Sequence, residues 1–182
     1  AGELLRILIR HPYVEITSVL SSSTAGADVT SFHRDLLGEL DMQFSDKSEF
    51  AVDLLSADVV FLCLGHGLSK EFLDEYTLKS GCRVIDLGND FRLEDSHKDF
   101  TFVYGLCDLF RDKVKSASNI ANPGCFATAI LLALSPLALA GEINDEIHIH
   151  AITGSTGAGR SLSDSSHFSY RDNNISVYKP FA

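Results

Sequence analysis

One cysteine of this sequence stands where a thiol can act as a nucleophile. Cys125 follows Pro123-Gly124, a dipeptide typical of turns. A short strand-like run, residues 118–121, precedes the turn, and a long run rich in Ala and Leu, residues 127–139, follows it. This order predicts a strand, a sharp turn and a helix, with Cys125 in the first helical turn. Unpaired N–H groups and the positive end of the helix dipole favour a thiolate there.

The alternative is that Cys125 is a small buried apolar residue, as most free cysteines are. The other cysteines, Cys63, Cys82 and Cys107, show neither Cys-x-x-Cys nor zinc-ribbon spacing. No signal peptide or long apolar span precedes them. We therefore expect free thiols in a reducing cytosol and a cytoplasmic protein without contact to a membrane.

Two arginines are the best candidates for binding an anionic substrate, Arg92 and Arg160. The planar guanidinium fork matches a phosphate or carboxylate through two hydrogen bonds, and the surrounding protein is acidic. The alternative is that each arginine pairs with a nearby acid, such as Asp90 or Asp164. The net charge of −10 argues against nucleic acid as a partner, because that surface requires a basic stripe.

Five other polar residues are weaker candidates. Ser155, in a loop between glycines, and Asn122, before the Pro-Gly turn, could contact substrate or merely form their turns. His66, between two glycines after a predicted strand, lies where nucleotides are contacted in α/β sheets, but it is more often a turn residue. His148 and His150 share one face of a predicted strand without a suitably spaced third ligand, so we expect no metal site.

The elements that must position these residues alternate between helix and strand. Helices are expected at 3–10, 69–80, 107–116 and 127–139, and strands at 14–20, 59–64, 83–87, 101–103 and 146–152. Such alternation is typical of an α/β fold with a doubly wound parallel sheet whose two faces are both buried. A chain of 182 residues can bury about 70% of its unfolded surface without disulfides.

The candidate cofactor residues lie near the N-terminus. Gly2 comes directly before the first predicted helix, where it could be the last glycine of a dinucleotide-binding turn or simply an exposed terminus. Ser21, Ser22 and Ser23 follow the strand expected at 14–20, where NAD-specific folds usually carry an acidic residue. Neutral hydroxyls leave room for the 2′-phosphate of NADP; the alternative is a solvated serine loop.

Five motifs occur in a fixed order along the chain. They are the segment IANPGCFATA at residues 120–129 with 134–136, the turn 62–69, the segment 84–93, the tripeptide 104–106 and the glycine-rich loop 154–160. Together they resemble the motifs of N-acetyl-gamma-glutamyl-phosphate reductases over essentially the whole chain. One departure is Gly65, where this family usually has proline.

The resemblance implies an NADPH-dependent enzyme of arginine biosynthesis. Such an enzyme reduces N-acetyl-L-glutamyl 5-phosphate to N-acetyl-L-glutamate 5-semialdehyde, with Cys125 holding the acyl group as a thioester. It also implies a Rossmann-like NADP-binding domain over residues 1–122, lacking its first strand. Residues 123–182 would begin a mixed α/β catalytic domain that builds a homo-oligomer, a dimer or a tetramer.

The resemblance also implies missing parts. The family's glycine-rich phosphate loop would precede Ala1, and its general acid/base histidine would follow Ala182. We therefore expect an internal fragment that is not fully active alone. Two other functions stay open: a related dehydrogenase of the aspartate-semialdehyde type, and a noncatalytic nucleotide-binding fragment.

Overall fold

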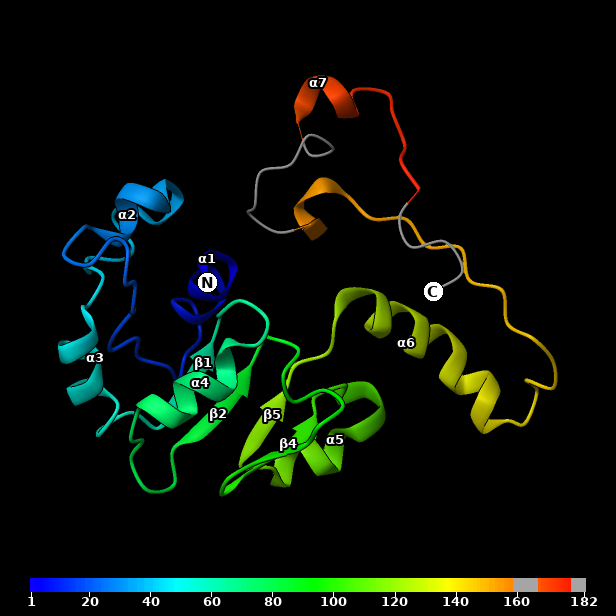
Figure 1. The fold of residues 1–182 in the computed structure, drawn as a ribbon, viewed down its shortest axis with the longest axis horizontal. Helices are drawn as coiled ribbons and strands as arrows, with labels where there is room; N and C mark the ends of the chain where they lie inside the picture. Colours follow the sequence, from blue (N-terminus) through cyan, green and yellow to red (C-terminus); the bar gives the residue numbers. More distant parts are fainter. Residues whose placement is uncertain (159–166, 178–182) are drawn as a thin grey trace. The chain divides into compact units, whose positions relative to one another are not determined.

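A five-stranded sheet forms the centre of the first of two compact units, Ala1–Gly124 and Cys125–Ala182 (Figure 1). The computed structural model describes residues 1–158 and 167–177. Four strands run parallel in the order β1 (Val59–Leu62), β2 (Arg83–Asp86), β5 (Asn119–Ala121) and β4 (Phe100–Tyr104), and β3 (Ser96–His97) pairs antiparallel with β4 at the edge. The Rossmann-like α/β fold is confirmed.

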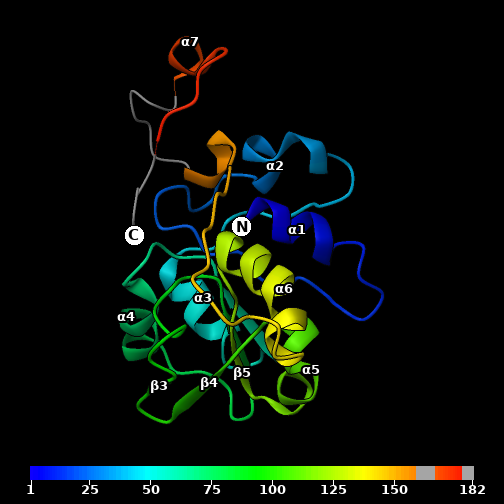
Figure 2. The same cartoon turned by 90° about the vertical axis from the view of Figure 1, so that its right-hand side faces the viewer.

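Helices lie on both sides of this sheet (Figure 2). On one face α3 (Lys47–Asp53) and α4 (Leu68–Glu75) pack over the main core, and on the other side α5 (Cys107–Ser116) lies next to β4. The buried residues of this core are Leu54, Val60, Leu62, Phe72, Leu73, Cys82, Val84, Phe91, Phe102 and Ala121. Burial alternates along β1 and β2, so the expectation that both sheet faces are buried is not met within this unit.

A buried asparagine sets the register of the central strands. Asn119 Oδ1 accepts the backbone N–H of Val84 in β2 at 3.1 Å, and its Nδ2 donates to the carbonyl of Thr101 at 3.1 Å. The side chain is only 6% exposed. Asn119 therefore bridges the strands on either side of β5 and satisfies backbone groups that would otherwise lack partners.

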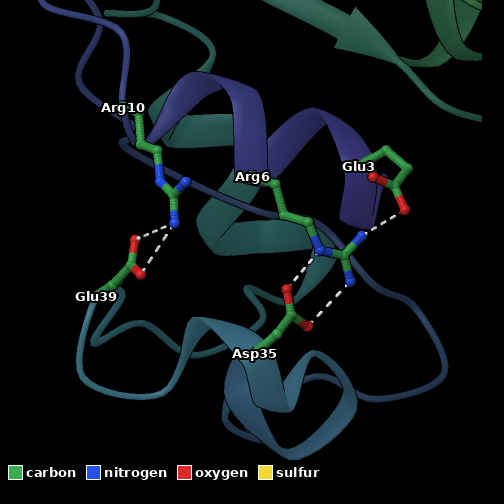
Figure 3. Close-up of polar contacts among 5 residues, drawn as sticks. All are labelled: Glu3, Arg6, Arg10, Asp35 and Glu39. Carbon is green, nitrogen blue, oxygen red and sulfur yellow. Dashed lines mark hydrogen bonds and ion pairs between the residues drawn. The ribbon is translucent and has the colours of Figure 1, made fainter.

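The N-terminal part of the chain forms a smaller layer within the first unit. Helices α1 (Gly2–Leu8) and α2 (Val29–Phe32) and the 3₁₀ turn η1 (Arg34–Leu36) surround a second core of Leu5, Val29, Leu36 and Phe44. Arg6 forms ion pairs with Glu3, at 2.6 Å, and with Asp35, and Arg10 reaches Glu39 at 3.2 Å (Figure 3). The hydrogen bond from Arg6 lowers the pKa of Asp35 to about 2.

Most predicted elements of this unit exist, with shifted ends. The helix 107–116 has the predicted bounds, whereas the first helix ends at Leu8, the strands expected at 59–64 and 83–87 end at Leu62 and Asp86, and β4 runs from Phe100 to Tyr104. The helix expected to reach Ser80 ends at Glu75, because Tyr76 is extended and stacks on Phe72. Helix α3 was not predicted, although Asp46 and Glu49 form a capping box there.

The strand predicted at 14–20 is wrong. Residue Leu20 forms one isolated parallel bridge with Ser45, and the backbone of Val19 accepts from the Ser45 N–H at 3.0 Å. An apolar extended segment becomes a strand only where a second strand lies alongside it, and among the described residues this segment forms only this one bridge.

The second unit contains the long helix α6 (Cys125–Leu139), the turn η2 (Ser155–Ala158) and the short helix α7 (Phe168–Arg171). The strand predicted at 146–152 is wrong: this segment is exposed and forms no ladder with any described part of the chain. Its alternating pattern signals a strand only if a partner strand pairs with it. Among the described residues, no helix has the length and apolar character needed to cross a membrane.

Candidate active site

Three loops gather at one edge of the sheet in the first unit. Because β1, β2 and β5 are parallel neighbours, the segments that follow them, 63–67, 87–95 and 122–124, leave from the same edge. Ligands of open α/β sheets bind outside these carboxyl ends of the strands. This edge is therefore the candidate site of the first unit.

The cysteine turn is held to β2 by its backbone. The N–H of Asn122 donates to the carbonyl of Asp86 at 2.8 Å, and the Asn122 side-chain amide donates to Pro123 O at 3.2 Å. Cys125 follows as the first residue of the 15-residue helix α6, and it is exposed. Its predicted place in the first helical turn is confirmed, and the alternative of a buried apolar residue is wrong.

The side chain of Arg92 contacts this turn. Its Nε donates to the carbonyl of Asn122 at 2.9 Å and its Nη2 to the carbonyl of Leu87 at 3.2 Å. A Cβ atom on Gly124 would lie 3.0 Å from Arg92 Nη1, so glycine permits this close approach. Arg92 is therefore held beside the cysteine turn, while its contact with substrate stays a prediction.

The acid suggested as a partner of Arg92 has another contact. Asp90 Oδ2 accepts the backbone N–H of Gly67 at 2.9 Å. Gly67 has φ +87°, a left-handed conformation that glycine adopts without strain, and it is the residue before α4. Asp90 thus joins the loop after β2 to the loop after β1.

A cavity of about 330 Å³ opens beside Arg92. Lys113, Tyr104 and the acidic Asp95 line it, and the remaining lining is apolar: Phe91, Leu93, Phe102, Val103 and Phe110. The cavity thus has two basic residues, Arg92 and Lys113, and one acidic residue, Asp95, in its lining.

The predicted cofactor residues lie in two places of the first unit. Gly2 begins α1, and a Cβ there would lie 2.5 Å from Cε1 of His33, so the glycine allows close packing against that ring. Ser22 and Ser23 are exposed in the loop after Leu20, while the hydroxyl of Ser21 accepts from Thr24 at 2.6 Å.

His66 is exposed in the loop between β1 and α4, at the carboxyl edge of the sheet. It lies one residue before Gly67, whose N–H is bound by Asp90. The structure thus places His66, Arg92 and Asn122 on loops of the same edge, whereas Gly2 belongs to the smaller layer.

The second unit carries the other predicted residues. Ser155 is exposed in η2, and Arg160 with its suggested partner Asp164 lies outside the described residues. His148 and His150 are exposed. The described part of the chain contains no group of three or more residues that could hold a metal ion.

Two buried residues of this edge were not predicted. Asp86 and Ser69 are both 0% exposed, and the Ser69 hydroxyl donates to Asp86 Oδ1 at 2.7 Å. The available signal was an acid, Asp86, inside the apolar run 84–87, because a carboxyl group buried there needs hydrogen-bond partners.

Comparison with known proteins agrees with this architecture. Residues 1–117 match the family described as semialdehyde dehydrogenase, NAD binding domain, and residues 125–182 match semialdehyde dehydrogenase, dimerisation domain. The chain therefore belongs to the semialdehyde dehydrogenase family, whose description implies a nicotinamide cofactor and an oligomer.

Several curated relatives have a more specific name. Proteins called N-acetyl-gamma-glutamyl-phosphate reductase from Christiangramia forsetii, Flavobacterium johnsoniae and Parabacteroides distasonis are 49%, 52% and 48% identical to this chain over 181, 185 and 181 residues. The matches cover 100% of this chain and 54%, 55% and 54% of those proteins. The chain thus spans about half the length of these relatives.

Proposed function

We propose that this chain forms the cofactor-binding domain and the cysteine turn of an NADPH-dependent N-acetyl-L-glutamyl 5-phosphate reductase of arginine biosynthesis. The main observation behind this proposal is that Cys125 is exposed at the first position of α6. It comes directly after a turn that is hydrogen-bonded to the end of β2. The names of the relatives support the choice of substrate.

The chemistry that this placement supports is acyl transfer to sulfur. The Cys125 thiolate attacks the acyl-phosphate carbon, an S–C bond forms, and the C–O bond to phosphate breaks. Backbone N–H groups at the start of α6 stabilise the oxyanion that develops on the acyl oxygen. Inorganic phosphate leaves with the electron pair of the broken bond, and a thioester remains on Cys125.

NADPH, when bound, supplies a hydride to the acyl carbon. The part of this chain is to hold the thioester at the edge of the sheet where such a cofactor binds. Once that carbon is reduced, the oxyanion on it would re-form the C=O bond of the aldehyde, while the C–S bond breaks and its electron pair returns to Cys125 as the thiolate.

The proposed substrate contacts are Arg92, Asn122, Ser155 and Arg160. The case for substrate contact is strongest for Arg92. Its side chain lies beside the cysteine turn, and it lines the same cavity as Lys113. A guanidinium group in this position suits the phosphate that leaves during acyl transfer.

The proposed cofactor contacts are Gly2, Ser21, Ser22, Ser23 and His66. Exposed hydroxyls of Ser22 and Ser23 can donate to a phosphate, and the loop 21–24 carries no carboxylate that would repel one. These residues fit the 2′-phosphate of NADP better than the free ribose hydroxyls of NAD.

The proposed division of labour follows the chain. Residues 1–122 bind NADP, and residues 123–182 begin the catalytic and oligomerisation domain of a homo-oligomer. The description of the second matching family as a dimerisation domain supports this assignment.

The test is a substrate comparison with the full-length protein. We expect reduction of NADP when N-acetyl-L-glutamate 5-semialdehyde and inorganic phosphate are both present, and none when phosphate is left out. Faster, phosphate-dependent reduction with L-aspartate 4-semialdehyde would assign the protein to the aspartate-semialdehyde type instead. Absence of reduction with both aldehydes would contradict the proposed reaction.

A further inference from the structure

Three segments of the candidate site meet at Asp86, a residue that the proposed chemistry does not use. Resting on the function proposed above, we propose that Asp86, together with Ser69, is a positioning residue for the reaction of Cys125. It holds the cysteine turn and the loop before α4 in one fixed arrangement at the end of β2.

The side chain of Asp86 fixes the start of α4. The Ser69 hydroxyl donates to Oδ1 at 2.7 Å, and the N–H of Gly88 donates to the same oxygen at 3.0 Å. Both Ser69 and Asp86 are 0% exposed. Water therefore has no access to replace either hydrogen bond, and loss of one leaves a buried polar atom without a partner.

The backbone of Asp86 fixes the cysteine turn. Its carbonyl accepts the N–H of Asn122 at 2.8 Å, three residues before Cys125. One residue thus binds α4 through its side chain and the turn through its main chain. Loss of the side-chain bonds at Asp86 would therefore release the start of α4 from the strand end to which the turn is attached.

A second carboxyl group strengthens the same connection. A Cβ atom on Gly88 would lie 3.1 Å from Asp86 Oδ1 and 3.3 Å from Asp90 Oδ2, so both carboxyl groups face this buried glycine. Asp90 in turn binds the N–H of Gly67, next to His66. The end of β2 and the loop after it therefore hold the start of α4 through two separate bonds.

This pattern suits positioning better than simple stabilisation of the core. Asp86 Oδ2 and Asp90 Oδ1 are buried and accept no hydrogen bond from the described residues. An apolar residue of similar size would avoid that cost of burial. A buried polar network instead selects one arrangement of the segments that it joins, and a reacting thiol needs such fixed geometry.

The experiment uses four variants of the full-length protein. Ser69→Ala removes one donor, Asp86→Ala removes the acceptor, and Asp86→Asn keeps an acceptor oxygen at the Oδ1 position. Cys82→Ala is the matched control, because Cys82 is buried in the same core just before the other end of β2.

Three quantities are measured for each variant. The first is the rate of iodoacetamide labelling of Cys125, read by peptide mass spectrometry to separate it from the exposed Cys63 and Cys107. The others are kcat and KM for the aldehyde reaction and the midpoint of thermal unfolding.

Ser69→Ala and Asp86→Ala are expected to slow Cys125 labelling and to lower kcat by at least about tenfold, because a small misplacement of reacting groups is costly. Asp86→Asn should restore both quantities toward wild type, and Cys82→Ala should lower only the unfolding midpoint. If Asp86→Ala does not fold, Ser69→Ala decides alone.

Wild-type labelling of Cys125 in Ser69→Ala would overturn the positioning role. The role is equally overturned if Asp86→Asn behaves like Asp86→Ala, or if Cys82→Ala causes the same losses. Absence of reductase activity in the wild-type protein would contradict the proposed function instead, and the labelling rates would still test the positioning role.

Discussion

Arg92 donates its Nε–H to the main-chain carbonyl of Asn122 at 2.9 Å, three residues before the exposed thiol of Cys125. A second bond, from Nη2 to the carbonyl of Leu87, fixes the guanidinium plane between the loops after β2 and β5. The arginine proposed to bind substrate thus also holds the turn that precedes Cys125, the proposed nucleophile.

Replacing Arg92 tests whether the planar geometry of its guanidinium group contributes to activity in addition to its charge. Arg92→Lys retains the positive charge but cannot donate to both carbonyls in the same plane, so we expect kcat/KM to fall by about tenfold to a hundredfold. The matched control is Lys113→Arg, which keeps a cation on the shared cavity. Steady-state kinetics with the aldehyde and phosphate measure both, and full activity of Arg92→Lys would contradict a role for the fork.

We expect the buried Asn119 of β5 to contribute to the stability of the fold. Asn119→Ala leaves the N–H of Val84 and the carbonyl of Thr101 without their side-chain partner. We expect the free energy of unfolding to fall by about 2–4 kcal/mol, as each unsatisfied buried group costs about 1–3 kcal/mol. Urea unfolding measures this loss, with the exposed Asn89→Ala as a control. A loss no larger than that of the control would contradict the bridging role.

The lowered pKa of Asp35 makes the stability of the fold depend on pH. The hydrogen bond from Arg6 lowers its pKa from 3.8 to about 2, so the folded state releases this proton more readily than the unfolded state. The stabilising effect is therefore complete only well above the ordinary pKa of 3.8, and it is lost as the pH falls from there through about 2. The difference in unfolding free energy between wild type and Asp35→Asn should shrink over this interval.

Urea titrations at several pH values measure that difference. The exposed Asp41→Asn is a suitable control, since no ion pair is found for Asp41 in the described part of the chain. A difference that stays constant from pH 5 to about pH 2 would show that the pair with Arg6 does not stabilise the fold in solution.

Local signals explain what the sequence predicted well. The Pro123-Gly124 dipeptide and the apolar run behind it are short-range features, and they placed Cys125 at a helix start, as observed. The segments 14–20 and 146–152 have equally clear apolar patterns. They are not strands here, because a strand also requires a neighbour that the pattern does not contain.

The network behind the site could not be predicted in the same way. Ser69 and Asp86 are 17 residues apart, and their hydrogen bond depends on how α4 packs beside β2. Neither residue type is distinctive by itself, since serines and aspartates are mostly exposed. Only the fold reveals that both are buried and that Asp86 also binds the backbone of Asn122.

Replacement of Cys125, the proposed nucleophile, gives the largest expected effect. Cys125→Ala should lower kcat/KM of the full-length protein by at least about a thousandfold, because no other group can form the covalent intermediate. Cys107→Ala is the matched control, as it removes another exposed thiol that begins a helix. Equal activity of these two variants would rule out Cys125 as the nucleophile.

Trapping the acyl group tests the central claim most directly. The full-length protein is mixed with N-acetyl-L-glutamyl 5-phosphate in the absence of NADPH, quenched in acid and digested for mass spectrometry. We predict one N-acetylglutamyl group bound as a thioester to the peptide that contains Cys125, with none in the Cys125→Ala variant. An active enzyme that accumulates no acyl group on this peptide, or carries it on another residue, would contradict the proposed mechanism.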